Sequence, residues 1–355
     1  MLSPADSISL LEAAYSDLAL GEAVCRPRID VRLPTPDGQA VYQWGSMEGG
    51  SARSGYFAIR IKSDILLERE YAGTRTQEKY CAEPGRYCGL VWLFSVRDGR
   101  PLALINDGVL QHQRVGADAA IGAKHLARPG AQVLGMLGSG GMARSHLAAL
   151  LEVLPLRRVQ VFSPTRAHRE RYAAEVGERY GIEAVAVAEP RRAQQGADIV
   201  AGCADAIADV IHGDALEPGT HVVCPGGRPD QAACQRIDVW LRLGDAPAPD
   251  GLPGWRTQAE KVAYRARRGD PVWQRYRAGG CRAGPAGRAR VIQFAELLAG
   301  SAPGRANSAE ITFSERGNIQ GAQFFPIAGR IYELAREKGL GRELPDDWLL
   351  QTVRD

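Results

Sequence analysis

The sequence lacks an apolar run of the roughly 18 residues that a membrane-spanning helix needs. It also lacks a strong excess of charge of either sign, because 44 Lys and Arg face 41 Asp and Glu, which leaves a net charge of +3. Because positive and negative residues are nearly equal in number, the net charge gives no sign of a nucleic-acid partner. Disorder is excluded too, since 45% of the residues are hydrophobic. We therefore expect a folded globular protein with no membrane and no nucleic-acid partner.

Cysteine is present, but its number and spacing do not indicate disulfide bonds or a metal site. There are seven cysteines, an odd number, and no two have C-x-x-C spacing. A disulfide framework and a zinc ribbon are therefore not predicted, and no metal site is expected. Free thiols in a reducing cytoplasm are the simpler interpretation. Residues 1–20 carry Asp6, Glu12 and Asp17, which do not fit a secretory signal, so we predict a cytoplasmic location.

The first third of the chain, residues 1–113, has the pattern of a mixed α+β unit. Apolar residues at helical spacing predict a helix over 7–20. Short apolar or alternating runs predict strands over 29–33, 56–61, 89–94 and 101–105. The turn Asp98-Gly99-Arg100 separates the last two and predicts a hairpin. We therefore expect a largely antiparallel sheet here.

From Arg114 the pattern changes to strands that alternate with helices. An Ala-rich helix is predicted over 114–126, and the uncharged run 133–137 predicts a strand buried on both faces. Alternation of this kind over 114–316 predicts an α/β fold with a parallel, doubly wound sheet of the Rossmann type. Residues 317–355 contain a long helical pattern that we expect to return to the first unit.

A glycine-rich turn follows the buried strand. Gly138-Ser139-Gly140-Gly141-Met142-Ala143 is a variant of the dinucleotide fingerprint, and it opens a helix, which is the context that gives the motif weight. Gly138 permits the tight turn, and Gly140 lets a pyrophosphate approach the backbone. Ala143 lets the helix pack closely on the strand. Free N–H groups at the helix start would then bind the phosphates.

The end of the next strand distinguishes the two nicotinamide cofactors. NAD sites usually place Asp or Glu there, to accept hydrogen bonds from the ribose. This chain has Ser163, Pro164, Thr165 and Arg166. Two hydroxyls and a guanidinium are suited to hold a 2′-phosphate, and no carboxylate repels it. The sequence therefore predicts NADP, with NAD less favoured.

Several basic residues are candidates for binding an anion. Arg114 is predicted at a helix start, where a positive charge is unfavourable and needs an anionic partner. Arg28 is a second candidate. Arg60 and Lys62 should project to the same side of a strand, since side chains alternate. A further arginine-rich stretch, 250–290, leaves a nucleic-acid arm as an alternative, although a solvated surface is the simpler interpretation.

Several motifs in their order resemble the ornithine cyclodeaminase/mu-crystallin family. They include Arg114-Val-Gly-Ala-Asp, Leu134-Gly-Met-Leu-Gly-Ser-Gly-Gly-Met-Ala-Arg, Pro218-Gly-Thr-His-Val, Glu296-Leu-Leu-Ala-Gly and Ile311-Thr-Phe-Ser. The resemblance implies a Rossmann domain and a substrate domain that dimerises, the latter formed by 1–113 with 317–355. It also implies chemistry at a carbon that bears an amino or imino group, with a nicotinamide cofactor.

The resemblance also implies roles for single residues. Arg28 and Arg114 would hold the substrate carboxylate, and the family's active-site lysine falls at Arg60 or Lys62. Arg228 stands where the family's cyclodeaminases have a catalytic Asp, and Asp230 is the nearest acid. Val115 replaces a Thr that often contacts phosphate.

These departures favour reduction of a preformed imine, which needs less proton transfer than a cyclodeaminase reaction does. We therefore predict an NADP-dependent oxidoreductase that acts on an imino or amino acid, as a homodimer. Catalytic residues would be Lys62, Arg60 and Asp230. Two alternatives stay open: an ornithine cyclodeaminase that uses NAD, and a crystallin-like protein that binds NADPH without catalysis.

Overall fold

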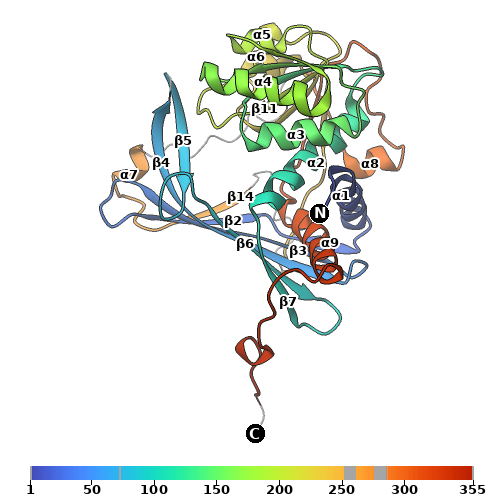
Figure 1. Cartoon of the computed structure of the whole chain (residues 1–355). Helices are drawn as coiled ribbons and strands as arrows, with labels where there is room; N and C mark the ends of the chain where they lie inside the picture. Colours follow the sequence, from blue (N-terminus) through green and yellow to red (C-terminus); the bar gives the residue numbers. More distant parts are fainter. Residues whose placement is uncertain (1, 72, 252–260, 276–284, 286, 354–355) are drawn as a thin grey trace.

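Two β-sheets, one largely antiparallel and one parallel, organise the chain (Figure 1). The structure is a computed structural model, and it describes residues 2–71, 73–251, 261–275, 285 and 287–353. In Figure 1 the parallel sheet and its helices lie above the antiparallel sheet, with the helices α1 (Pro4–Ala19) and α2 (Gly108–Leu126) between them.

The antiparallel sheet is formed mainly by the first third of the chain. Its strands are β1 Ala23–Cys25, β2 Arg28–Pro34, β3 Val41–Ser51, β4 Tyr56–Tyr71, β5 Thr74–Tyr80, β6 Cys88–Ser95, β7 Pro101–Asn106 and β14 Lys261–Arg265. The order is β14-β2-β3-β4-β6-β7, with β1 beside β3 and β5 beside β4, and only β14 runs parallel to its neighbour. The predicted antiparallel sheet and the hairpin between β6 and β7 are confirmed.

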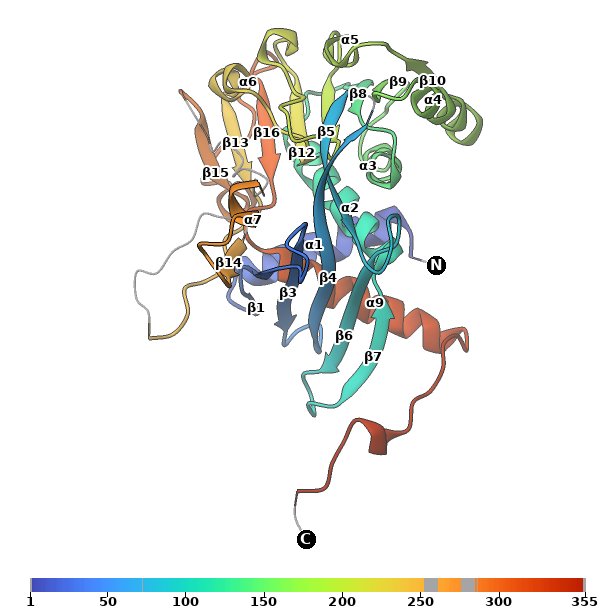
Figure 2. The same ribbon diagram turned by 90° about the vertical axis from the view of Figure 1, so that its left-hand side faces the viewer.

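The strand β4 continues ten residues beyond its predicted end at residue 61. The run Lys62-Ser63-Asp64 is polar, which ends the apolar run but keeps the alternation of buried and half-buried side chains. With β5 it forms an arm that rises beside the parallel sheet (Figure 2). The Ile207 N–H donates to the Arg75 carbonyl at 3.0 Å, so the arm contacts the other half of the molecule.

The parallel sheet holds the second half. Its strands are β8 Val133–Leu137, β9 Arg158–Phe162, β10 Glu183–Ala186, β11 Ile199–Cys203, β12 His221–Gly226, β13 Val239–Arg242, β15 Arg290–Gln293 and β16 Thr312–Glu315. The order is β10-β9-β8-β11-β12-β16-β13-β15, and every pairing is parallel. The chain therefore reverses its direction of winding between β8 and β11, where Rossmann folds bind their nucleotide.

Helices cover both faces of the parallel sheet, as a doubly wound fold requires. Besides α1 and α2 the helices are α3 Gly141–Leu151, α4 Arg166–Tyr180, α5 Pro190–Gln194, α6 Gln231–Arg236, α7 Val272–Arg275, α8 Phe294–Leu298 and α9 Phe324–Glu337, with 3₁₀ turns at Gly213–Ala215 (η1), Gln320–Gln323 (η2) and Asp346–Trp348 (η3). The apolar core against one face includes residues of α2, α3 and α4, and the core against the other includes residues of α5 and α6. The predicted fold class is confirmed.

A third core joins the two halves. It includes Tyr15 of α1, Ile121 of α2, Leu93 of β6 and Phe325 of α9, all no more than 2% exposed. The helix α9 packs on β4, β3, β6 and α1, which is the return to the first unit that its pattern predicts. The antiparallel sheet therefore has one face covered by helices.

Two parts of the predicted division at 113/114 need correction. Residues 109–113 contain neither glycine nor proline, so α2 begins at Gly108 and runs through the boundary. The strand β14 lies inside the predicted 114–316 domain but pairs with the free edge of β2, because it completes the antiparallel sheet there. Arg114 is consequently in the second turn of α2, and the argument from a helix start does not apply to it.

Some predicted features fall partly outside the described residues. Arg256, Arg277 and Cys281 lie outside them, while the other six cysteines are free thiols. Within the described part, no helix has the length and apolar content needed to cross a membrane. No group of three or more potential metal ligands occurs there either.

Candidate active site

One face of the antiparallel sheet carries buried ionised side chains, which we call the charged face. It consists of Arg28, Asp30, Arg32, Arg60, Lys62, Asp64 and Asp107. Arg60, Lys62 and Asp64 alternate along β4 and so share one side of it, as the period of two predicts. All of them except Arg28 are less than 9% exposed. Ionised groups are seldom buried unless they are paired or used, so this face is the first candidate for a site.

Two glycines make room for these side chains. Asp30, Gly45, Lys62 and Gly89 stand in one row across four neighbouring strands. A Cβ on Gly45 would lie 2.7 Å from Lys62 Cε, and a Cβ on Gly89 would lie 2.1 Å from Asp107 Oδ1. Glycine inside a strand often marks such a close approach. The absent side chains of the two glycines are thus replaced by charged groups from their neighbours.

Each cation on β4 has a carboxylate partner. Arg60 donates to Asp107 Oδ2 through Nε at 2.6 Å and Nη2 at 2.5 Å, and Lys62 Nζ lies 2.7 Å from Asp64 Oδ2. Burial, and then the charge of Arg28, hold the pKa of Lys62 well below its usual value, while Asp64 opposes the shift. Lys62 therefore loses its proton more readily than a solvated lysine does, whereas a guanidinium keeps its proton.

Arg28 belongs to this face, and Arg114 of α2 is the other arginine predicted to bind the substrate carboxylate. Arg28 makes a bidentate pair with Asp30, at 2.8 and 3.1 Å. Arg114 is 3% exposed and donates only to neutral side chains, those of Gln111 and Gln323. Among the described residues no carboxylate lies within ion-pair distance of Arg114. A buried guanidinium with neutral partners is suited to an anionic ligand.

The ring of Phe324 links Arg114 to the charged face. The Arg114 guanidinium carbon lies 4.6 Å from the ring centroid, and that of Arg60 lies 5.9 Å from it. Gln323 also bonds to Tyr15 and Asp118, which holds the start of α9 against α1 and α2. The structure thus brings together Arg60 and Arg114, which the sequence proposes for one site.

The glycine turn has the geometry that a bound dinucleotide needs. Gly138 has φ +122°, and a Cβ there would lie 2.5 Å from the carbonyl oxygen of Cys203, at the end of β11. A Cβ on Gly140 would meet nothing within 4 Å, which leaves open space in front of the backbone. No side chain caps the N-terminus of α3. These residues fit a pyrophosphate held by backbone N–H groups.

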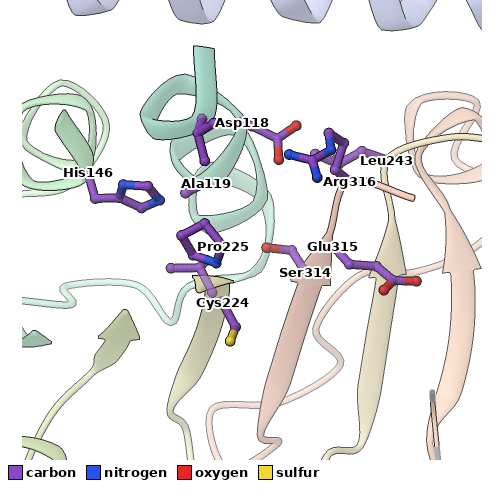
Figure 3. A pocket seen from close by; sticks show the side chains of 11 residues that line it. Asp118, Ala119, His146, Cys224, Pro225, Leu243, Ser314, Glu315 and Arg316 are labelled. Carbon is purple, nitrogen blue, oxygen red and sulfur yellow. The ribbon is translucent and has the colours of Figure 1, made fainter. Parts of the chain in front are cut away.

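A pocket connects the nucleotide edge of the parallel sheet with α2 (Figure 3). Its walls come from Val115 and Ala119 of α2, His146 of α3, Pro225 of β12 and Ser314 of β16, among others. In Figure 3 the side chain of Asp118 points toward that of Arg316 at one end of this pocket. Gln323 donates a hydrogen bond to Asp118 and accepts one from Arg114, so this end of the pocket lies close to Arg114.

The residues predicted to hold the 2′-phosphate lie between β9 and the first turn of α4. Ser163 is buried, and Thr165 stands at the N-cap of α4, where its hydroxyl accepts no hydrogen bond from the first-turn N–H groups. Arg166 is exposed and pairs with Glu170 at 2.6 Å. Arg169, which the sequence analysis does not single out, donates to the Ser163 and Pro164 carbonyls. Arg169 thus holds the backbone of residues 163 and 164 in place.

Two residues expected near the reaction have partners within the parallel-sheet half. Asp230 caps α6, because its carboxylate accepts from the N–H groups of Ala233 and Gly213. Arg228 pairs with Asp209 at 3.2 Å and donates to the Ile207 carbonyl. Each therefore has a structural task of its own.

The pattern of residues in the chain matches that of known proteins. The family model "Ornithine cyclodeaminase/mu-crystallin family" matches residues 74–338. The chain belongs to this family. It is 29% identical to the iminosuccinate reductase of Paracoccus denitrificans over 97% of this chain and 96% of that protein. It is 25% identical to the Δ1-pyrroline-2-carboxylate reductase of Bacillus cereus over 72% of this chain and 74% of that protein.

The same fold occurs in a solved structure of the family. The Δ1-pyrroline-2-carboxylate reductase of Thermococcus litoralis, in complex with NADH and L-proline, has a TM-score of 0.71, 22% identity, and coverage of 97% of both chains. The relatives named as iminosuccinate and Δ1-pyrroline-2-carboxylate reductases bear out the predicted class, an oxidoreductase of imino or amino acids.

Sequence reasoning for this family member missed the carboxylates of the charged face. Asp30 and Asp64 each stand two residues after a predicted basic residue, so alternation places them on the same side. Gly45 and Gly89 lie inside strands, which is a second signal of a close approach. Asp107 could not be found in this way, because it lies beyond β7 and meets Arg60 only in the folded chain.

We expect Gly138→Ala to weaken binding of a nicotinamide dinucleotide about tenfold or more, because a Cβ at positive φ is strained and would contact the Cys203 carbonyl. Calorimetric titration measures the dissociation constant. Gly177→Ala on the surface of α4 is the matched control, since its Cβ would meet only one atom, at 3.9 Å. Equal affinities for Gly138→Ala and the wild type would contradict the assignment of this turn.

Proposed function

We propose that this chain uses NADPH to reduce the C=N bond of an α-imino acid or cyclic ketimine. The observation that carries the proposal is the charged face, where a buried lysine of lowered pKa lies among carboxylates beside two arginines. Relatives that reduce iminosuccinate and Δ1-pyrroline-2-carboxylate support it.

The cofactor would lie along the carboxyl edge of the parallel sheet. Residues 138–143 would hold the pyrophosphate, and Ser163, Thr165 and Arg166 would hold the 2′-phosphate. NADPH, when bound, supplies a hydride to the imine carbon. The absence of an acid after β9 supports NADPH over NADH, because a carboxylate there would repel the phosphate.

Arg28 and Arg114 would bind the substrate carboxylate and so fix which face of the imine is presented. Arg114 contributes a buried charge with only neutral protein partners. Arg28 is 18% exposed at its side chain, which leaves it accessible to a ligand. Orientation by two guanidinium groups accounts for much of the acceleration expected when hydride transfer needs no covalent intermediate.

Lys62, rather than Arg60, would deliver the proton to the imine nitrogen. Its ammonium group loses a proton more easily than that of free lysine, whereas Arg60 keeps its charge and is held by Asp107. We place Asp64 beside it as the carboxylate that orients Nζ, because Asp230 already caps α6. Lys62 would regain its proton from solvent after each turnover.

The cyclodeaminase alternative has less support. A cyclodeaminase must move protons in both directions after hydride transfer, and therefore needs an acid and base beside the substrate. At the position where the family's cyclodeaminases carry Asp, Arg228 is bound to Asp209 and to the 207 carbonyl. Reduction of a preformed imine needs only one proton, which Lys62 can supply.

We expect nicotinamide absorbance to fall when the protein is mixed with NADPH and members of a panel of α-imino acids and cyclic ketimines. The kcat/KM for NADPH should exceed that for NADH about tenfold, because the 2′-phosphate adds charge-assisted hydrogen bonds. Equal values for the two cofactors would exclude the NADP assignment. NADPH binding without turnover of any imine would favour the non-catalytic alternative, and ammonia release from ornithine would favour the cyclodeaminase.

Lys62→Met should lower kcat about 100-fold or more, because the proton donor is lost. In the wild type, kcat should fall as pH rises through the lowered pKa of Lys62, since only the ammonium form donates, and this limb should be absent in the variant. Lys124→Met, which removes a lysine paired with Glu12 on α1, is the control. A variant at position 62 with wild-type kcat and pH profile would refute the role.

We also propose a homodimer in the cytoplasm, formed through the uncovered face of the antiparallel sheet. This face exposes Leu33, Trp92, Leu104 and Tyr264 by 40% or more. After α9 the chain runs away from the body (Figure 1) and exposes further apolar side chains, including Trp348 at 71%. In a two-fold dimer each protomer makes the same contacts with the other. A second copy would therefore cover both the exposed sheet face and the apolar side chains after α9. A related alanine dehydrogenase has been solved as a dimer.

Trp92→Asp should shift the protein from dimer to monomer at micromolar concentration, because it places a charge at the centre of the proposed contact. Sedimentation velocity at several concentrations measures this. His168→Asp, on the exposed side of α4, should leave the dimer intact. A wild-type monomer at every concentration, or an unaffected variant, would contradict the proposed interface.

A further inference from the structure

His146 is a buried polar residue that the site described above does not use. It lies on α3, one turn after the glycine-rich motif, and has no exposed surface. Gly116 allows α2 to pass close to α3, because a Cβ there would lie 2.5 Å from the Ser145 carbonyl oxygen. The imidazole lies in the wall of the pocket in Figure 3, which Val115 and Ala119 of α2 also line.

The hydrogen bonds of His146 determine its tautomer. Its Nδ1 lies 2.7 Å from the Met142 carbonyl oxygen, which can only accept, so Nδ1 carries the proton. Burial lowers the pKa of His146 to about 4, with the Met142 carbonyl opposing the shift, so the ring is neutral at neutral pH. The second nitrogen, Nε2, therefore has a free lone pair and can only accept a hydrogen bond.

Nε2 has no hydrogen-bond partner among the described residues. A buried acceptor without a donor costs free energy, so such an atom in a pocket wall indicates that a ligand supplies the donor. The pocket is built from α2, α3, β12 and β16, which are the elements at the nucleotide edge. Its walls are partly apolar, through Val115, Ala119 and Pro225, which suits a flat ring.

We propose that His146 Nε2 accepts a hydrogen bond from the carboxamide N–H of the nicotinamide and so positions the ring. The inference rests on the proposed function, because it presumes that a nicotinamide cofactor is bound. An amide is a neutral donor, which a neutral imidazole can receive without a change of charge in the pocket. A cationic substrate nitrogen would be better served by the carboxylates of the charged face. His146 is thus a positioning residue for the cofactor.

A cofactor analogue isolates this one hydrogen bond. The 3-acetylpyridine analogue of NADP⁺ carries a methyl ketone in place of the carboxamide, so it keeps the carbonyl and loses the N–H donor. Calorimetric titration of both nucleotides gives the ratio of their dissociation constants. We expect the wild type to bind NADP⁺ about five- to tenfold more tightly than the analogue, which corresponds to one net hydrogen bond.

The variants then show whether His146 is the acceptor. In His146→Leu the ratio should fall to about one, while His146→Gln, whose side-chain carbonyl also accepts, should keep part of it. His125→Leu, at the other end of α2, should leave the ratio unchanged. The comparison of two ligands on one variant separates the hydrogen bond from any general loss of stability.

Several outcomes would overturn the proposal. A ratio near one in the wild type, or the same ratio in the wild type and in His146→Leu, would show that the carboxamide does not use this acceptor. If His146→Leu does not fold, His146→Phe, which also lacks an acceptor, takes its place, and an unchanged ratio in that variant overturns the proposal in the same way. Binding of neither nucleotide would refute the proposed function itself, and it is distinguished from the other results because no heat is released with either ligand.

Discussion

The burial of ionised side chains on one face of the antiparallel sheet is the constraint on which the proposed chemistry depends. Removing a charge from water costs several kcal/mol, and it is tolerated only where a partner of opposite charge is close. Arg60 with Asp107 and Lys62 with Asp64 meet this condition at hydrogen-bond distance. Such pairs are weak sources of stability. Their presence on a glycine-lined face is therefore better explained by function.

The helix α2 connects this face to the nucleotide edge. It carries Arg114 toward Phe324 and the sheet, and it carries Val115 and Ala119 into the pocket beside α3. One rigid element thus sets the relation between the cluster that would bind the substrate and the motif that would bind the cofactor. Hydride transfer needs the two ligands in contact and correctly oriented, so a continuous helix suits this task better than a hinge.

Local patterns predict the parallel-sheet half well. The strand 133–137 is uncharged because both of its faces are covered, and the glycine turn follows it directly, so periodicity and a short motif are sufficient. The first half is harder. Its strand β4 continues through a polar stretch, and β14 joins the sheet from far along the chain, which no local signal predicts. Long-range pairing depends on which edge is free, and only the folded sheet decides that.

The fold class, the glycine turn, and the shared side of Arg60 and Lys62 can be predicted from the chain alone, because each depends on neighbours within a few residues. The folded structure sets which groups these side chains meet. It paired Arg60 with Asp107 across 47 positions and set Arg114 against Gln323 across 209. Arg114, predicted at the start of a helix, lies in the second turn of α2, because that helix begins at Gly108. Contacts between distant residues arise from packing, and packing depends on the whole chain.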